Sequence, residues 1–391
     1  MDKVKFLNLG RQPIANGFLN ENEFADEFFY DLSVGFDSET SLVTHMDYVE
    51  PTLMFNEDYS YRGSMSNTMQ NHFREFSKHI KGFLPNKPKV LEIGSNDGVF
   101  LVNWDKNTSY AVEPCSNFAE ETNSLGYHTY CDFWNEELSK KILEEKGKID
   151  LVFAANCMCH IPDLDDAFSS VSRVLSGDGL FVFEDPSLAE VVNLNSYDQI
   201  YDEHPHIFSV TCLDKLLRRN GLSIVRVDNT SVHGGSNRIW AKKTDSSFLI
   251  DSSVSLNLDL EKVLGLDEAS TFHKFSERVE KSKEDLFDLL CRCREQGKKI
   301  ISYGATSKST TIFNYCGIDR NLISYITDTT PEKQNKFSPG MHIPIVPPED
   351  YISESVDFAF LGAWNFATEI RRKEKNFKGK FITHVPTVRF I

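Results

Sequence analysis

The stretch from Val90 to Gly98, VLEIGSNDG, constrains the fold of this chain more than any other. A short apolar run contains Glu92 and is followed by Gly94 and Gly98, the pattern of a buried strand, a glycine turn and a helix start. Glycine lets the backbone approach a ligand closely, and a helix N-terminus beside it favours a nucleotide-like group. The turn therefore predicts an α/β domain with a ligand site at the end of its first strand.

The spacing of the glycines indicates which ligand fits. It is not the Gly-x-Gly-x-x-Gly of loops that hold a pyrophosphate, and an acidic residue stands two positions before the first glycine. A carboxylate there suits a ligand with an amino group and a positive charge, such as S-adenosylmethionine (SAM). The loop residues expected to bind this cofactor are Glu92, Gly94, Ser95, Asn96, Asp97 and Gly98.

The next predicted strand, 110–114, ends in a second carboxylate. Glu113 lies 21 residues after Glu92, where it can accept hydrogen bonds from both ribose hydroxyls, and Pro114 follows it. Phe133 is expected beside the adenine ring, although an ordinary helix start explains its segment equally well. These residues extend the predicted cofactor site along the sheet.

A continuous apolar run at 149–156 is typical of a buried strand in a parallel sheet. Ligands in open α/β sheets bind beyond the carboxyl ends of the strands. Asn156 and His160 therefore fall at the mouth of the predicted site, Asn156 on the cofactor side.

Composition excludes several classes of protein. The 391 residues carry a net charge of −16, which argues against a nucleic-acid polymer as partner. The sequence has no apolar stretch near 18 residues and no signal-like start, so we expect a cytoplasmic protein without a membrane partner. None of its eight cysteines forms a Cys-x-x-Cys pair, so no metal site is predicted, and the thiols are read as buried and free.

The chain divides into three predicted regions: 1–70, 71–244 and 245–391. The first holds short apolar segments without sustained periodicity and is expected to be a small α+β domain. The second alternates strands and helices and ends in two strands without a helix between them, as in a SAM-type Rossmann-like sheet with an antiparallel final strand. The third begins with helices to about 297, with Phe272, Phe275, Val279 and Leu286 near one face.

A second doubly wound α/β unit is predicted after residue 297. An apolar strand at 299–303 runs into the loop 304–308, and later apolar runs lie at 322–326, 357–361 and 380–385. The loop is rich in small residues and carries Lys308, so its backbone N–H groups can hold a phosphate. A plain helix cap is an equally good reading of the loop alone.

Two polar clusters fall at the same edge of the central sheet. The segment 201–206, YDEHPH, concentrates ionisable groups, and a histidine there suits proton abstraction next to a carbonyl. A neighbouring carboxylate can fix its tautomer, and a tyrosine can donate to a developing enolate. The segment 233–238, HGGSNR, precedes a strand and is either a substrate-binding turn or a simple hairpin.

Together these motifs resemble, in order and over almost the whole chain, the SAM-dependent C-methyltransferases that act on nucleotide-linked 4-keto deoxysugars. The segments that carry the resemblance are 9–16, 59–68, 92–98, 159–164, 201–204, 233–238, 303–308, 314–318 and 339–344. The resemblance implies a three-domain enzyme with SAM as cofactor and a keto sugar, linked to dTDP, as substrate. The sequence does not distinguish a monomer from a weak dimer.

The resemblance also implies roles for the polar clusters. His204 is expected to remove the proton beside the ketone, Glu203 to orient its imidazole, and Tyr201 and His160 to stabilise the enolate or hold the sugar. His160 is the alternative base. The expected substrate-binding residues are Tyr59, Tyr61, His233, Gly234, Gly235, Ser236, Arg238, Gly304, Ala305, Thr306, Ser307, Lys308 and Asn314.

Other activities are compatible with parts of the pattern. An O- or N-methyltransferase on a related nucleotide sugar would need a base but no enolate stabiliser. A NAD-dependent sugar oxidoreductase is disfavoured by the glycine spacing, and a non-catalytic SAM or sugar-nucleotide sensor by the intact set Tyr201, Glu203 and His204.

One departure from the family pattern concerns zinc. The N-terminal domain of the family binds a structural zinc through cysteines, whereas residues 1–114 contain no cysteine. Gly35 and Ser38 are read as standing where one Cys-x-x-Cys pair would be. We therefore expect zinc to be absent and the region to be held by packing of its aromatic residues, Phe18, Phe24, Phe28, Phe29, Tyr30 and Phe36.

Overall fold

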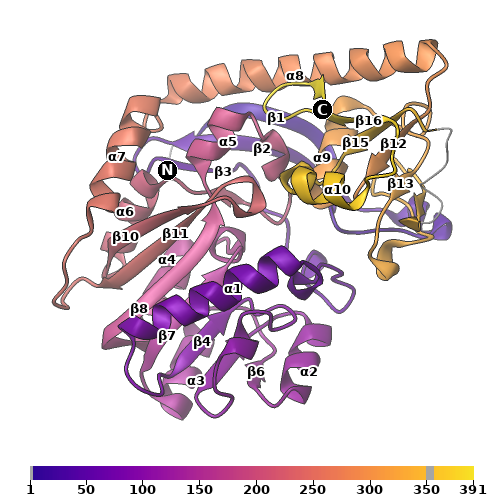
Figure 1. Ribbon diagram of the computed structural model, residues 1–391. Helices are drawn as coiled ribbons and strands as arrows, with labels where there is room; N and C mark the ends of the chain where they lie inside the picture. Colours follow the sequence, from indigo (N-terminus) through magenta and orange to yellow (C-terminus); the bar gives the residue numbers. More distant parts are fainter. Residues whose placement is uncertain (1–2, 349–355) are drawn as a thin grey trace.

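The computed structural model describes residues 3–348 and 356–391, and within them the strands form three sheets (Figure 1). The central sheet has the strand order β10-β11-β8-β7-β4-β5-β6. Its strands are β4 (Val90–Ile93), β5 (Ser109–Val112), β6 (His128–Tyr130), β7 (Ile149–Ala155), β8 (Leu175–Pro186), β10 (Leu222–Thr230) and β11 (Ser236–Lys243). The predicted Rossmann-like sheet is confirmed, including its antiparallel final strand, since β11 runs antiparallel to β8 while β4 to β8 are parallel.

Helices cover both faces of this sheet. On one face, α1 (Asn67–Ile80) packs Phe73 and Phe76 against apolar residues of β7, β8 and β11. The other face is covered by α4 (Leu164–Val174) and α6 (Val210–Arg219), whose apolar side chains join a second core cluster. The remaining helices of the unit are α2 (Ser116–Ser124), α3 (Glu136–Lys146) and α5 (Leu188–Leu194). Parallel strands buried on both faces explain the continuous apolar runs in the sequence.

The helix expected directly after Gly98 was wrong. Among the described residues, the connection from β4 to β5 contains only a short 3-10 helix, Leu101–Asn103. Phe100, Leu101 and Trp104 are all buried, so three of five consecutive side chains point inward. Since β5 begins at Ser109, the connection is too short for a full helix and a loop leading into the next strand.

The N-terminal sheet is antiparallel and has the order β1-β2-β3-β9. Its strands are β1 (Lys3–Pro13), β2 (Phe29–Asp37), β3 (Leu42–His45) and β9 (His206–Ile207). The last strand comes from the polar segment 201–206 and its neighbour, so this sheet is completed by a part of the chain far along the sequence. The described helices between residues 3 and 66 are short 3-10 turns, so this region has less helix than predicted.

The C-terminal sheet has the order β14-β13-β12-β15-β16-β17 and is parallel except for its last strand. The second doubly wound unit is thereby confirmed. Its elements are β12 (Ile300–Tyr303), α9 (Ser307–Cys316), β13 (Ile326–Thr327), β14 (Ile345–Val346), β15 (Phe358–Leu361), α10 (Ala367–Lys373), β16 (Lys380–Thr383) and β17 (Arg389–Phe390). The run at 322–326 forms a strand only at its end, because Ile323 is buried in the turn before β13.

A long helix packs against both the N-terminal sheet and the C-terminal unit. After α7 (Ser252–Leu264), the helix α8 (Ala269–Glu295) runs along the top of the molecule past β1 toward the C-terminal sheet (Figure 1). The ring of Phe272 lies 5.1 Å from that of Phe6 and 4.7 Å from that of Phe36, while Leu286 and Leu290 face the C-terminal unit in the same core cluster. The predicted apolar face of α8 is confirmed, and it gives the first and third regions one continuous core. None of the described helices is long and apolar enough to cross a membrane.

At the two positions read as replacing a Cys-x-x-Cys pair, Gly35 and Ser38, the N-terminal sheet and its turn offer neither a thiol nor an imidazole. Gly35 lies inside β2, where a Cβ would be 2.6 Å from the Met46 sulfur, so a larger residue there would require the Met46 side chain to move. The turn from β2 to β3 is closed instead by Asp37, whose carboxylate accepts hydrogen bonds from the Glu39 backbone and the Thr40 hydroxyl, both at 2.9 Å. Of the aromatic residues expected to pack here, Phe18 and Phe36 are buried but Phe28 is 46% exposed.

We therefore expect the purified protein to contain less than about 0.1 zinc per chain, because a structural zinc site needs four N, S or O ligands. Elemental analysis measures this directly. EDTA should leave the midpoint of thermal unfolding unchanged, since no metal contributes to folding. About one zinc per chain, together with a lower midpoint in EDTA, would contradict the prediction.

Candidate active site

One cavity of about 520 Å³ lies where the three sheets meet, and its wall takes residues from every part of the chain. Phe55 and Tyr59 come from the N-terminal region, Glu92 and His160 from the central sheet, and Lys308 from α9. The carboxyl ends of β4, β5 and β7 open onto it, as expected for a ligand site in an open α/β sheet. The cavity therefore has a cofactor end above the central sheet and a second end facing the C-terminal unit.

Glycine is required at the first position of the β4 turn. Gly94 has φ of 71°, and a Cβ there would lie 2.6 Å from the Cys157 sulfur, so a larger residue is excluded by both conformation and space. Its N–H donates to the Val112 carbonyl oxygen at 2.8 Å, which fixes the turn against β5. The bare backbone of the turn forms part of the cavity wall.

Carboxylates crowd the cofactor end and lack a cation. Glu92 is 3% exposed, and its Oε2 atom is buried without a hydrogen-bond partner. Burial, followed by repulsion from Glu113 and Asp97, raises the pKa of Glu92 well above its usual range. Burial also raises the pKa of Glu113, whose oxygens accept from the backbone N–H groups of Asn96 at 2.7 Å and Cys115 at 2.9 Å. A bound ligand with an ammonium and a sulfonium would favour the charged form of these carboxyl groups.

Most of the residues predicted for the cofactor line this cavity. They are Glu92, Gly94, Ser95, Asn96, Glu113, Pro114, Phe133 and Asn156. Asp97 and Gly98 are not in its wall: Asp97 turns away and accepts the Ser64 N–H at 3.0 Å, and Gly98 closes the turn on Ser95. The Asp97 side chain therefore binds the segment before α1 and does not face the cavity.

His204 is held in one tautomer. Its Nδ1 atom lies 2.7 Å from the Gln199 carbonyl oxygen, which can only accept, so Nδ1 carries the proton. Its Nε2 atom then has a free lone pair and accepts from the Tyr201 hydroxyl at 2.8 Å. Burial, with His160 and Lys308 nearby, lowers the pKa of His204 well below its usual value. The ring is therefore neutral at pH 7, with a basic nitrogen in the cavity.

Glu203 does not hold this imidazole, contrary to the prediction. Its carboxylate oxygens accept from the Asn16 amide at 2.6 Å and the Tyr59 hydroxyl at 2.8 Å, both from the N-terminal region. A backbone carbonyl has taken the orienting role instead, because Gln199 ends the short 3-10 helix just before this loop. Glu203 thus ties the loop 201–206 to the first part of the chain.

His160 completes the polar group. Its ring stacks on that of His204 with a centroid distance of 5.1 Å and on Phe55 at 5.4 Å, and its Nε2 atom is buried without a partner. Burial lowers the pKa of His160 to about 3, so it is neutral. Ligand atoms of Cys159, His160 and His204 lie within 4.8 Å of one another, but both nitrogens of His204 are already engaged. We assign no metal to them.

The far end of the cavity carries two lysines. Lys308, in the first turn of α9, lies 5.9 Å from the centre of the Tyr201 ring, and Lys333 donates to the Ala305 carbonyl oxygen at 2.8 Å. Burial lowers the pKa of both, while attraction to Glu203 opposes that shift. Thr306 caps α9 by accepting the Ser309 N–H. This end combines a helix start with positive charge, which suits an anionic group.

The predicted substrate residues divide into two sets. Tyr59, Tyr61, His233, Thr306, Ser307 and Lys308 line the cavity, whereas Gly234, Gly235, Ser236, Arg238, Gly304, Ala305 and Asn314 are not in its wall. Arg238 points to the other face of its strand, where it bonds Glu184 at 2.6 Å and lies 3.9 Å from the Phe76 ring. Asn314 donates to the carbonyl oxygens of Thr310 and Pro339. Successive side chains alternate between the two faces of β11 and turn around the axis of α9, so Arg238 and Asn314 point away from the cavity.

Three contributors were missed by residue patterns. Asn16 lies in a segment that carried the family resemblance, so that segment was the available signal for it. The Gln199 carbonyl is a backbone group, which no side-chain pattern reveals. Lys333 lies in an exposed-looking polar stretch but is 7% exposed, and nothing local in the sequence indicates its burial.

Solved structures match part of the chain at low similarity. Magnesium protoporphyrin IX methyltransferase from Synechocystis PCC 6803, crystallised with SAH, is 16% identical and matches 45% of this chain and 83% of its own, with a TM-score of 0.34. A SAM-dependent methyltransferase from Clostridium acetobutylicum is 17% identical over 46% of this chain and 93% of its own, with a TM-score of 0.35. These scores are too low to assign an activity.

Family comparisons cover the rest of the chain. Residues 63–227 match the profile "Methyltransferase domain", residues 231–386 match "C-methyltransferase C-terminal domain", and residues 1–55 match a domain profile whose description names zinc binding. C-methyltransferase NovU from Streptomyces niveus is 31% identical over 398 aligned residues, covering 100% of this chain and 94% of NovU. The chain belongs to the family of SAM-dependent C-methyltransferases that includes NovU.

Proposed function

We propose that this C-methyltransferase transfers a methyl group to the carbon beside the ketone of a nucleotide-linked 4-keto deoxysugar, with dTDP as the nucleotide. The observation that carries the proposal is His204, which is neutral and held in one tautomer. It shares its cavity with residues of the glycine turn 94–99, here called the SAM loop. A C–H bond next to a carbonyl is acidic enough for such a base, whereas an O- or N-methyltransferase needs no group to stabilise an enolate.

In this proposal His204 takes the proton. As the sugar binds, the Tyr201 hydroxyl would turn from Nε2 of His204 to the ketone oxygen, which frees the Nε2 lone pair. The C–H electrons move into the ring carbonyl to form an enolate, and the proton goes to Nε2 of His204. The Nδ1–H bond to Gln199 supports the resulting imidazolium. Burial and the nearby carboxylates raise the pKa of Tyr201 well above its usual value, so its hydroxyl stays protonated and can donate to the enolate oxygen. When bound, SAM would supply an electrophilic methyl, with the new bond to the enolate carbon formed as the methyl–sulfur bond breaks and its electrons stay on sulfur in S-adenosylhomocysteine.

The sugar nucleotide is proposed to lie toward the C-terminal unit, with residues 245–391 as the nucleotide-binding domain. The start of α9 and Lys308 face the cavity, so the diphosphate would meet backbone N–H groups and one ammonium. His160, with its unpartnered Nε2, is proposed to hold the sugar near the base. Holding both reactants in one cavity lowers the barrier through proximity, by up to roughly 7–11 kcal/mol.

Glu113→Ala should weaken SAM binding roughly 10- to 100-fold, because hydrogen bonds to a buried carboxylate are among the stronger ones. Isothermal titration calorimetry measures the affinity. Glu120→Ala, an exposed acid on the neighbouring helix, is the matched control and should bind like the wild type. Unchanged affinity of the Glu113 variant would remove this carboxylate from the cofactor site.

His204→Asn should lower kcat by about 10²–10⁴-fold with SAM affinity unchanged, because asparagine keeps hydrogen bonding but cannot accept the proton. Solvent deuterium exchange at the carbon beside the ketone, followed by mass spectrometry, isolates the proton-transfer step. The exposed His79→Asn variant is the control and should keep full activity. In the wild type, kcat should rise with pH along a limb below pH 6.5 and be level at neutral pH, since the lowered pKa keeps the imidazole neutral there.

Two outcomes would change the assignment. If His160→Asn abolished exchange while His204→Asn retained it, His160 would be the base. Methyl transfer without any exchange at that carbon would favour an O- or N-methyltransferase. A panel of nucleotide sugars incubated with labelled SAM identifies the acceptor by the mass of the product.

A further inference from the structure

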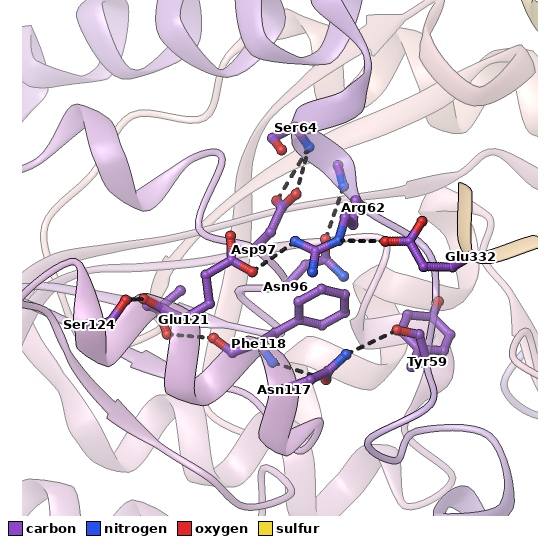
Figure 2. A network of polar contacts seen from close by, with 12 residues as sticks. Tyr59, Arg62, Ser64, Asn96, Asp97, Asn117, Phe118, Glu121, Ser124 and Glu332 are labelled. Carbon is purple, nitrogen blue, oxygen red and sulfur yellow. Dashed lines mark hydrogen bonds and ion pairs between the residues drawn. The ribbon is translucent and has the colours of Figure 1, made fainter. Parts of the chain in front are cut away.

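The segment 59–66, here called the strap, leads into the N-terminus of α1 and lies against the SAM loop. Figure 2 shows it fastened from below by Asn96, Asp97 and α2. The Asn96 amide bonds it twice, donating to the Tyr61 carbonyl oxygen and accepting the Gly63 N–H, both at 2.9 Å. Asp97 accepts the Ser64 N–H at 3.0 Å. The polar atoms of two cofactor-loop side chains are thus directed to the strap.

The strap lies close to this loop at Gly63. A Cβ on Gly63 would lie 3.0 Å from a methyl carbon of Val99, at the end of the same loop. Asn96 itself has φ of 49°, an unusual conformation that its two hydrogen bonds to the strap help to maintain. The shape of the SAM loop and the position of the strap therefore depend on each other.

Arg62 fastens the outer side of the strap. Its Nη1 atom lies 2.7 Å from the Glu121 carboxylate of α2, its guanidinium lies 5.0 Å from the centre of the Phe118 ring, and its Nε atom lies 4.0 Å from Glu332 of the C-terminal unit (Figure 2). Asn117, one residue before Phe118, donates to the Tyr59 carbonyl oxygen at 3.2 Å. Arg62 on the strap thus contacts both the central unit, through Glu121, and the C-terminal unit, through Glu332.

At its inner end the strap carries Tyr59, which bonds Glu203 at 2.8 Å. The contacts form a continuous path from the SAM loop through the strap to the loop that holds His204. We propose that the strap is a positioning device, with Arg62 as its fastening residue, that sets Tyr59 and Glu203 in place when the SAM loop is occupied. Arg62 touches neither reactant and is a positioning residue; its effect on turnover rests on the function proposed above.

The first test measures the strap without any sugar substrate. In hydrogen-exchange mass spectrometry, S-adenosylhomocysteine should slow exchange in the 61–64 segment of the wild type, because it orders the loop that accepts the N–H groups of Gly63 and Ser64. Arg62→Ala should speed exchange there about tenfold in the free enzyme. Arg173→Ala is the matched control: it removes an arginine of similar exposure, 27% against 30%, that bonds Glu136 at 3.0 Å between α4 and α3.

The second test is a double-mutant cycle on turnover. Arg62→Ala should lower kcat about tenfold with KM for SAM within about twofold, whereas in a Tyr59→Phe background the same change should cost less than about twofold. A half-exposed ion pair adds little to stability, so the variant should fold, and Arg62→Lys serves if it does not, with an intermediate kcat. Equal effects in both backgrounds, or a change confined to KM, would overturn the positioning role.

The two tests separate the strap from the proposed chemistry. Exchange at 61–64 that ignores S-adenosylhomocysteine, or that responds equally to Arg173→Ala, would overturn the strap whatever the sugar turns out to be. A strap that responds as expected in an enzyme whose His204→Asn variant is fully active would leave the strap standing and overturn the base.

Discussion

The site depends on two adjacent buried carboxylates that the central unit cannot satisfy by itself. Asp202 accepts the Ala15 N–H at 3.1 Å, and Glu203 accepts from Asn16 and Tyr59. Buried charges without donors are strongly destabilising, so the loop 201–206 adopts this shape only when the N-terminal segment lies against it. The carbonyl oxygen of Ala15 in turn accepts the Thr310 hydroxyl of α9 at 3.0 Å, which brings the C-terminal unit into the same arrangement.

The central sheet was predictable because its sequence signals are local and physical. The apolar runs of β4, β7 and β8 and the glycine turn after β4 each reflect burial or backbone conformation at one place. The turn was correctly located but its helix was not, because the connection from Gly98 to β5 at Ser109 is short and holds only a 3-10 turn. Signals of this kind say where a loop lies and leave its partners undetermined.

The candidate site was predictable only where type and position were both decisive. Tyr201, Glu203 and His204 lie together in the cavity, yet the partner of His204 is a backbone oxygen, and Glu203 pairs with residues more than 140 positions earlier. For Arg238 the residue type suited a substrate site, but its position along the strand did not. Its side chain points to the face of the sheet away from the cavity and pairs there with Glu184. Long-range pairing and the phase of a strand are set by the whole fold.

The core shared by β1 and α8 has a consequence for synthesis. The strand leaves the ribosome early, but Phe272 and Phe275, which cover its apolar face, follow more than 250 residues later. At about 5–20 residues per second this delay amounts to roughly 13–50 s. Throughout that interval Phe6, Leu7 and Phe36 lack the α8 side chains that cover them in the folded enzyme, which leaves apolar surface of the kind that chaperones bind.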